Sequence, residues 1–297
     1  MLSRRPLHRR LGYLLEGIGA AILFAGFRLL PLDRASGLGG WFARTIGPRL
    51  GASKRARINL RRALPELGAA EIERIIAGMW DNLGRVVAEY PHLDAFDVYA
   101  PGSRVEVIGA DAIRADRSPE KRYIFFSAHY GNWEIAPLAA TQAGFALTGI
   151  YRAANNPIVD WLIRRQRRNL GSELIPKGSV AARGALAAIR EGRHLCLLVD
   201  QKMNDGIAVP FFGRDAMTAP ALARLALRFD CIVVPTRVER LAGARFRLTC
   251  DPPLPLPRSG DLHADVLTLM TAVNAAVERW VRARPGQWFW VQRRWHD

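Results

Sequence analysis

A histidine and a glutamate five residues apart, His129 and Glu134, could perform acid–base chemistry. The apolar run 123–126 before them predicts a buried strand, which ends in small residues and then delivers His129. On a helix of 3.6 residues per turn, an offset of five places two side chains roughly 140° apart, so they can meet only if the chain turns between them. Gly131 and Asn132 supply such a turn, because Gly tolerates positive φ and Asn is a favoured helix N-cap.

Polar groups at the ends of other predicted strands could converge with His129, because ligands of open α/β sheets bind outside the carboxyl ends of the strands. A histidine held by a carboxylate at that edge can act as a general base. The alternative is a strand-end histidine beside an unrelated surface glutamate. The candidates for substrate binding, some of which also fit ordinary surface or capping positions, are Arg152, Asn155, Asn156, Asp200, Gln201, Phe211, Phe212, Gly213 and Arg237.

Several kinds of catalytic site lack their signature in this sequence. There is no G-x-S-x-G elbow, no G-x-x-x-x-G-K-[S/T] phosphate loop, and no H-E-x-x-H or other metal-ligand pair among the six histidines. What remains is a His–Glu base with no protein nucleophile beside it. The reaction that fits is activation of a substrate hydroxyl for direct attack on an acyl donor, with arginines binding the oxyanion and the donor's phosphates.

The elements that must position these residues alternate between strand and helix. This alternation predicts an α/β fold with a single, mostly parallel sheet flanked by helices. We expect 210–213 and Thr218 to lie on a loop. No repeat or low-complexity segment indicates a second catalytic domain. Residues 36–297 are therefore expected to form a single catalytic domain. The strands are predicted at 105–108, 123–128, 146–151, 194–199, 231–238 and 246–250, and the main helices at 71–90, 135–143, 158–170, 179–191, 219–228 and 262–283.

The N-terminal segment 1–35 is predicted to be a membrane anchor. A basic cluster precedes the apolar stretch 11–32, which is about the length that spans a bilayer core. Glu16 and Arg28 interrupt that stretch, so it could span with both charges snorkelling, or lie as an interfacial helix. A buried amphipathic helix is the alternative. A cleaved signal peptide is not favoured, because no small-residue cleavage site follows cleanly.

The charge of the chain points to an anionic partner. The formal net charge is +16, from 43 Lys+Arg against 27 Asp+Glu, which fits nucleic acid, an anionic membrane surface or a phosphorylated substrate. The basic run 49–62 beside an anchor would attract anionic lipid head groups, although a solvated helix face fits it as well. The three cysteines contain no C-x-x-C pair, so we expect reduced thiols and no zinc site.

Several motifs together resemble one family. HYGNWE at 129–134 resembles the H-x-x-x-x-[D/E] motif of the lysophospholipid acyltransferase superfamily, and its G-N-W-E form is similar to the lipid A late acyltransferases, which transfer lauroyl and myristoyl chains in lipopolysaccharide synthesis. Further blocks of that family are matched by RINLRRALP at 57–65, YRAANNP at 151–157, the D-Q…V-P-F-F-G block at 200–213 and QWFWVQRRW at 287–295.

The resemblance implies roles for individual residues. His129 corresponds to the general base, Glu134 to its partner carboxylate, and Arg152 falls in the block tied to acceptor phosphate or oxyanion binding. Asp200 and the 210–213 segment would line the same site. The chain departs from the pattern at Gln292, where the family ending commonly has His, and this puts a role for that position in doubt.

The resemblance also implies the substrates and the location. The donor would be an acyl carrier protein thioester and the acceptor a hydroxyl of a lipid A precursor, with no cofactor or metal, at the cytoplasmic face of the bacterial inner membrane. Related enzymes that use acyl-CoA, or that acylate another glycolipid, aminolipid or phospholipid, remain alternatives. A basic nucleic-acid-binding protein is a remote one, because the tryptophans gather near the C-terminus and the anchor would be unexplained.

Overall fold

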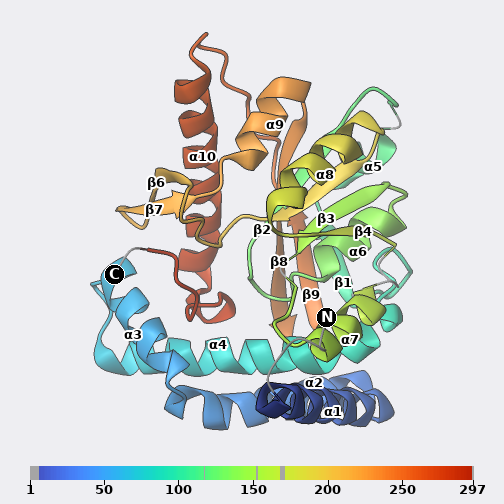
Figure 1. Ribbon diagram of the computed structural model, residues 1–297, viewed down its shortest axis with the longest axis vertical. Helices are drawn as coiled ribbons and strands as arrows, with labels where there is room; N and C mark the ends of the chain where they lie inside the picture. Colours follow the sequence, from blue (N-terminus) through green and yellow to red (C-terminus); the bar gives the residue numbers. More distant parts are fainter. Residues whose placement is uncertain (1–6, 117, 152, 168–170, 296–297) are drawn as a thin grey trace.

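The computed structural model describes residues 7–116, 118–151, 153–167 and 171–295. A seven-stranded sheet forms the centre of the molecule (Figure 1). Its strand order is β1-β9-β8-β2-β5-β3-β4, and a separate two-stranded sheet pairs β6 with β7. The strands are β1 (Val105–Ile108), β2 (Tyr123–Ser127), β3 (Leu147–Tyr151), β4 (Glu173–Pro176), β5 (His194–Leu198), β6 (Ile207–Phe211), β7 (Arg214–Thr218), β8 (Ile232–Ala242) and β9 (Arg245–Cys250).

Five neighbouring strands of this sheet, from β8 to β4, run parallel. Strand β9 is antiparallel to β8 and parallel to β1, so the edge formed by these two strands runs the other way. The predicted fold, a mostly parallel sheet flanked by helices, is therefore confirmed.

Helices cover both faces of the sheet and one of its ends. They are α1 (Leu7–Leu29), α2 (Leu32–Ile46), α3 (Ala52–Ala63), α4 (Ala69–Glu89), α5 (Asp111–Ala115), α6 (Ile135–Gln142), α7 (Pro157–Arg167), α8 (Ser179–Arg190), α9 (Ala221–Phe229) and α10 (Leu262–Ala283), with short 3₁₀ turns at Gly47–Arg49, Tyr90–Ala95 and Pro285–Gln287. Figure 1 shows α4 lying across one end of the sheet, with α1 and α2 stacked on its far side.

The core has two halves because the side chains of a strand alternate between the faces of a sheet. Ile124 and Phe126 of β2 belong to the half formed with α3, α4 and α8 to α10, and Phe126 stacks on Trp280 at 5.9 Å between ring centres. Tyr123 and Phe125 belong to the other half, with α5, α6 and the end of α4. Strand β2 is thus buried on both faces, which is typical of a central parallel strand.

Three strands, β4, β6 and β7, differ from the sequence prediction. The segment predicted as a loop, which includes Pro210, Gly213 and Thr218, forms the antiparallel hairpin of β6 and β7. Pro210 is tolerated there because this two-stranded sheet leaves edge positions open, and Gly213 has a φ of 67° at the tight turn. The short edge strand β4 was not predicted, because four residues of mixed polarity show no clear alternation.

Candidate active site

His129 and Asp200 form a hydrogen-bonded pair at one edge of the sheet. His129 lies two residues beyond β2, and Asp200 lies two residues beyond β5, which pairs with β2 in parallel register. The carboxyl ends of parallel neighbours meet at the same edge, so the two side chains are brought together. The His129 Nδ1 atom lies 2.8 Å from Asp200 Oδ1, and the His129 backbone N–H donates to Asp200 Oδ2 at 2.9 Å.

Asp200 is fully buried and accepts further hydrogen bonds from the C-terminal segment. Trp288 Nε1 donates to its Oδ2 atom at 2.8 Å, and Gln292 Nε2 donates to the same oxygen at 3.0 Å. Burial opposes ionisation of this carboxyl, but the charge of His129 and the hydrogen bonds from His129 and Gln292 outweigh it and hold the pKa of Asp200 well below its ordinary value. Asp200 is therefore a carboxylate at neutral pH.

This pairing gives the imidazole of His129 a defined orientation. An Nδ1–H donated to Asp200 leaves Nε2 with a lone pair, which is the arrangement of a general base. The Nε2 atom lies 3.5 Å from Gln201 Nε2, and the Trp133 ring lies beside the imidazole at 5.1 Å between centres. The side chain of His129 keeps 16% of its surface exposed, whereas that of Asp200 keeps none, so a substrate can reach the ring.

Glu134 makes a second buried cluster of charge next to the pair. Its carboxylate accepts from Arg167 Nε at 2.9 Å and Arg167 Nη2 at 2.5 Å, and from the hydroxyl of Tyr90. Burial opposes ionisation of Glu134, but the ion pair with Arg167 and the Tyr90 hydrogen bond outweigh it, so its pKa is lowered. Burial and the Glu134 charge raise the pKa of Tyr90, which stays protonated as a donor.

The carboxylate that contacts the His129 ring in this structure is thus Asp200. Glu134 is 2% exposed, so it is not a surface glutamate. The pairing of Glu134 with His129 in catalysis stays a prediction.

The turn between His129 and Glu134 is held by the backbone and by α4. Gly131 has a φ of 56°, and a Cβ at this position would lie 1.8 Å from the carbonyl oxygen of Val238, so only glycine fits. Asn82 Nδ2 donates to the Gly131 carbonyl at 2.9 Å. The Asn132 side chain accepts from the backbone N–H of Glu134 at 3.2 Å, and Glu134 is the N-cap residue of α6.

A buried ion pair fixes the same turn to β8. Asn132 Nδ2 donates to Glu89 Oε2 at 2.8 Å, and Arg240 Nη2 donates to the same oxygen at 2.9 Å. Arg240 Nε also donates to the Asn82 side chain at 2.9 Å. Because both members of the ion pair are buried and hydrogen-bonded, this network rigidly locates the chain that carries His129.

The other predicted site residues do not all lie near His129. Gln201 lies beside His129, as described, whereas Arg152, the oxyanion candidate, lies outside the described residues. Asn155 is exposed, and Asn156 is buried against α1, where its Nδ2 donates to the Tyr13 carbonyl at 2.8 Å.

Four predicted residues have contacts that do not involve the imidazole of His129. Phe211 and Phe212 pack in an aromatic cluster, and Phe211 meets Trp288 at 5.8 Å between centres, directly behind Asp200. Gly213 forms the hairpin turn. Arg237 forms an ion pair with Asp251 at 2.7 Å.

The partners that complete both charged clusters could not be recognised from the sequence. Tyr90 ends the predicted helix 71–90, and Arg167 belongs to the arginine-rich run 164–168, which by charge alone predicts a basic surface for docking the membrane or an acidic carrier protein. Trp288 and Gln292 were visible only as part of the tryptophan-rich C-terminal motif. Within the described residues, no group of three His, Cys, Asp or Glu side chains lies close enough to hold a metal ion.

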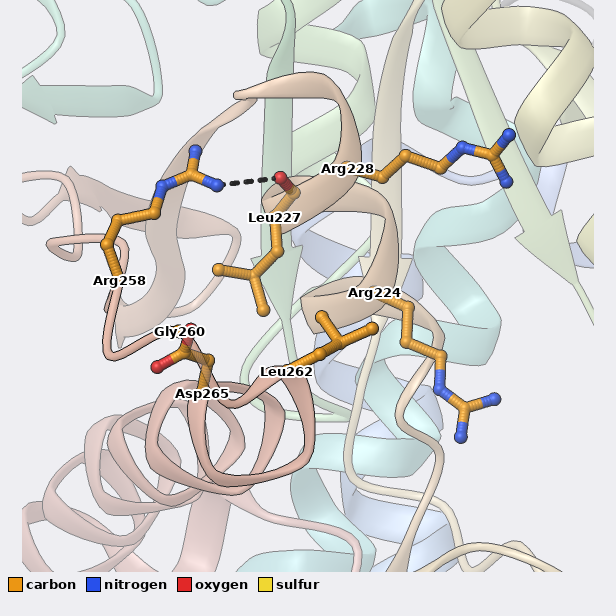
Figure 2. Close-up of a pocket in the computed structure, with 7 residues that line it drawn as sticks. All are labelled: Arg224, Leu227, Arg228, Arg258, Gly260, Leu262 and Asp265. Carbon is orange, nitrogen blue, oxygen red and sulfur yellow. Dashed lines mark hydrogen bonds between the residues drawn. The ribbon is translucent and has the colours of Figure 1, made fainter.

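One cavity lies away from this edge of the sheet. It has a volume of 730 Å³ and is lined by residues of α9, the segment before α10 and the start of α10 (Figure 2). Arg258 donates to the carbonyl of Leu227 across it at 2.9 Å, whereas Arg224 and Arg228 extend outwards. Among the part of the chain that the structure describes, none of the candidate site residues lines this cavity.

Comparison with known proteins supplies the family. The model of the bacterial lipid A biosynthesis acyltransferases matches residues 2–297. The lipid A biosynthesis myristoyltransferase of Escherichia coli is 28% identical over 247 residues, which cover 82% of this chain and 75% of that protein. The lipid A biosynthesis acyltransferase of Haemophilus influenzae is 24% identical over 276 residues, covering 91% and 82%, and the lauroyltransferase of Escherichia coli is 25% identical over 254 residues, covering 81% and 79%.

Proposed function

Because the chain belongs to the bacterial lipid A biosynthesis acyltransferase family and is an O-acyltransferase, we propose that it transfers a fatty acyl chain from an acyl carrier protein thioester to a hydroxyl of a lipid A precursor. The acceptor would be the hydroxyl of a 3-hydroxyacyl chain on a phosphorylated glucosamine lipid, at the cytoplasmic face of the inner membrane. The observation that carries the proposal is the His129–Asp200 pair, because its geometry prepares Nε2 to accept a proton.

In the proposed mechanism, His129 Nε2 takes the proton of the acceptor hydroxyl as its oxygen attacks the thioester carbonyl. The tetrahedral oxyanion then collapses, the C–S bond breaks, and the leaving thiolate takes the proton back from the imidazolium. Asp200 stabilises the imidazolium and holds the tautomer, as a buried carboxylate does in other His-based sites. A base of this kind contributes about 10²–10⁴ in rate.

We propose that Glu134 acts in this site through Arg167 and Tyr90. The ion pair joins the end of α7 to the first turn of α6, and so to the short chain that carries His129. Support comes from the burial of both charges, since a buried ion pair keeps its geometry when each partner is fully hydrogen-bonded. Arg152 remains the proposed ligand of the acceptor phosphate or the oxyanion.

The choice of acyl carrier protein as donor draws its support from the charge of the chain. An acidic carrier protein would be attracted to this arginine-rich chain, whose formal net charge is +16. A coenzyme A donor is the competing possibility, and direct comparison of the two thioesters separates them.

The experiment is an acyl-transfer assay with purified full-length protein, a lipid A precursor and either thioester. His129→Ala should lower the rate by about 10²–10⁴. His263→Ala is the matched control, because that histidine is exposed at the start of α10, and it should transfer at the wild-type rate. Near wild-type transfer by His129→Ala would overturn the proposed base.

A second measurement tests the acceptor. Lipid A from a strain that lacks this protein should be missing one secondary acyl chain by mass spectrometry, and the wild-type gene should restore it. An unchanged lipid A would exclude this acceptor class while leaving the assignment as an acyltransferase intact.

A further inference from the structure

The N-terminal helix α1 is attached to the body of the protein near its beginning. Asn156 Nδ2 donates to the carbonyl of Tyr13 at 2.8 Å and to the carboxylate of Glu16 at 3.1 Å. Gly17 is buried against α7, where an added Cβ would lie 2.6 Å from Ile158 Cγ2. The close approach of the two helices therefore depends on glycine at this position.

The other end of α1 is attached as well. Arg28 forms a bidentate ion pair with Asp94 at 2.8 and 2.9 Å and donates to the carbonyl of Pro91 at 2.9 Å. The His92 ring nitrogen lies 2.8 Å from the carbonyl of Phe27. Glu16 and Arg28, the two charges that interrupt the apolar stretch, thus both have partners in the globular body. The helix has 23 residues and is about 34 Å long, and these contacts hold its side at two places, around Tyr13–Gly17 and at Phe27 and Arg28.

The side of α1 that is turned away from the body is apolar and uncovered. Leu11, Leu15, Ile18, Ile22 and Leu29 recur at helical spacing on that side, and their exposed fractions lie between 47% and 85%. Leu11–Leu29 is also long and apolar enough to cross a membrane by length and composition. A helix crossing the bilayer would have to leave the contacts described above.

The apolar side continues over α2, which packs beside α1 beneath α4 (Figure 1). Gly39 and Gly40 turn towards α4, whereas the opposite side of α2 exposes large apolar side chains. On α7, which contacts α1, Trp161 is 47% exposed. We call this surface the apolar face; besides the five residues of α1 it consists of Leu38, Trp41, Phe42, Ile46 and Trp161.

The residues around the apolar face indicate what covers it. Arg34, Arg44, Arg49 and Lys54 are exposed on α2, α3 and the turn between them, and aromatic rings such as Trp41 lie in the face. Large apolar side chains bordered by cations are the pattern of a surface that lies in the interface of an anionic bilayer. A second copy of the chain would place the same cations against each other, which is unfavourable.

From these contacts we propose that α1 lies in the plane of the membrane interface and does not cross the bilayer, so that the apolar face inserts into one anionic leaflet. This inference goes beyond the proposed function and does not depend on it. The leaflet would then lie beside the candidate active site, because α7 carries two relevant residues. Trp161 belongs to the apolar face, and Arg167, six residues later, donates to Glu134.

The test measures the depth of fluorescent labels at Leu15→Cys, Ile22→Cys and Leu29→Cys in the full chain. The protein is bound to vesicles of phosphatidylethanolamine with phosphatidylglycerol, and quenching is read from lipids brominated at different carbons. We expect all three labels at the same shallow depth. Leu262→Cys, at the far end of α10, should not be quenched, and unsubstituted protein gives the background of the native thiols.

Other outcomes would overturn the inference. In a spanning helix successive labels would be about 10 Å apart along the bilayer normal, given 1.5 Å per residue, so the label at 22 would lie near the bilayer centre and much deeper than the label at 29. Unquenched labels on a protein that is dimeric by light scattering would assign the apolar face to a second copy. In a binding assay, the double variant Leu15→Glu/Ile22→Glu should lower vesicle affinity at least tenfold while Leu262→Glu leaves it unchanged. Equal affinity of both variants would also contradict insertion.

Discussion

The two ends of the central parallel strands carry one histidine each, in opposite surroundings. His129, beyond the carboxyl end of β2, lies against the carboxylate of Asp200 at 2.8 Å. His194, at the amino end of β5, packs against the rings of Tyr123 and Phe145, and its Nδ1 accepts from the Tyr123 backbone N–H at 3.1 Å. Burial and the charges of Arg122 and Arg193 lower the pKa of His194 to about 4.

The difference shows that the charge beside a buried histidine decides what it can do. At the carboxyl end, the carboxylate of Asp200 faces the ring of His129 and fixes the position of its Nδ1 atom. At the amino end, burial and the positive charges of Arg122 and Arg193 lower the pKa of the ring, so it stays neutral and serves as a hydrogen-bond acceptor. The following substitutions test this contrast.

Asp200→Asn should have the largest effect on activity. The amide would offer an N–H to Nδ1 and favour the tautomer with the proton on Nε2, so we expect transfer to fall about 10³-fold, or about 4 kcal/mol in activation free energy. Initial rates with the thioester donor measure this, alongside thermal unfolding to confirm an intact fold. A variant within threefold of wild type would show that the carboxylate does not support the base.

Glu134→Gln should lower stability more than any exposed ion-pair change. It leaves the buried guanidinium of Arg167 without its carboxylate, and we expect a loss of about 3 kcal/mol in the free energy of unfolding. Glu106→Gln, which breaks the exposed pair with Arg247, is the control and should cost less than about 1 kcal/mol. Equal losses in a denaturant titration would contradict a structural role for the Glu134 pair.

The difference in stability between wild type and Glu134→Gln should depend on pH in a defined direction. The folded-state pKa of Glu134 is lowered, so its stabilisation is present above the ordinary carboxyl pKa of 4.5 and is lost as the pH falls through the folded value. Wild type and Glu134→Gln should therefore converge in stability in acid. Unfolding midpoints that stay equally far apart at all pH values would argue against the ion pair as the cause.

Substitution of Gln292 should have a moderate effect on acyl transfer, and two variants test it. Gln292→Leu removes one of the donors to buried Asp200, and we expect transfer to fall by up to about tenfold, the equivalent of one hydrogen bond to a charged group. Gln292→His, the residue common in the family ending, can donate a ring N–H and should stay within about threefold of wild type. If both variants behave alike, the position does not act through its hydrogen bond.

His194→Asn should have the smallest effect, and only on stability. The folded-state pKa of His194 is lowered, so the unfolded chain binds an extra proton between about pH 4 and the ordinary value of 6.5, and wild type loses stability as the pH falls through that window. Because the side chain is partly exposed, we expect this component to be about 1 kcal/mol. The variant should lack that slope and keep wild-type transfer at neutral pH; a large loss of transfer would erase the contrast between the two ends.

The sequence was most informative about which elements form and least informative about their order in space. Alternating strands and helices predicted the sheet, and both His129 and Asp200 were selected because they follow strands. Their pairing depends on β2 lying next to β5 although β3 and β4 intervene in the chain, and periodicity does not encode strand order. Similarly, the arginine-rich pattern of α7 could not single out Arg167 as the buried member, because its burial depends on how α7 meets α4 and α6.

The distance along the chain between His129 and the groups that hold Asp200 has a consequence for biosynthesis. Trp288 and Gln292 follow Asp200 by 88 and 92 residues, so the hydrogen bonds to Asp200 are complete only after both have been translated. At about 5–20 residues per second, the ribosome needs roughly ten seconds or more to pass from His129 to that segment. A nascent chain would therefore present α1 and its apolar face well before the surroundings of His129 and Asp200 are complete.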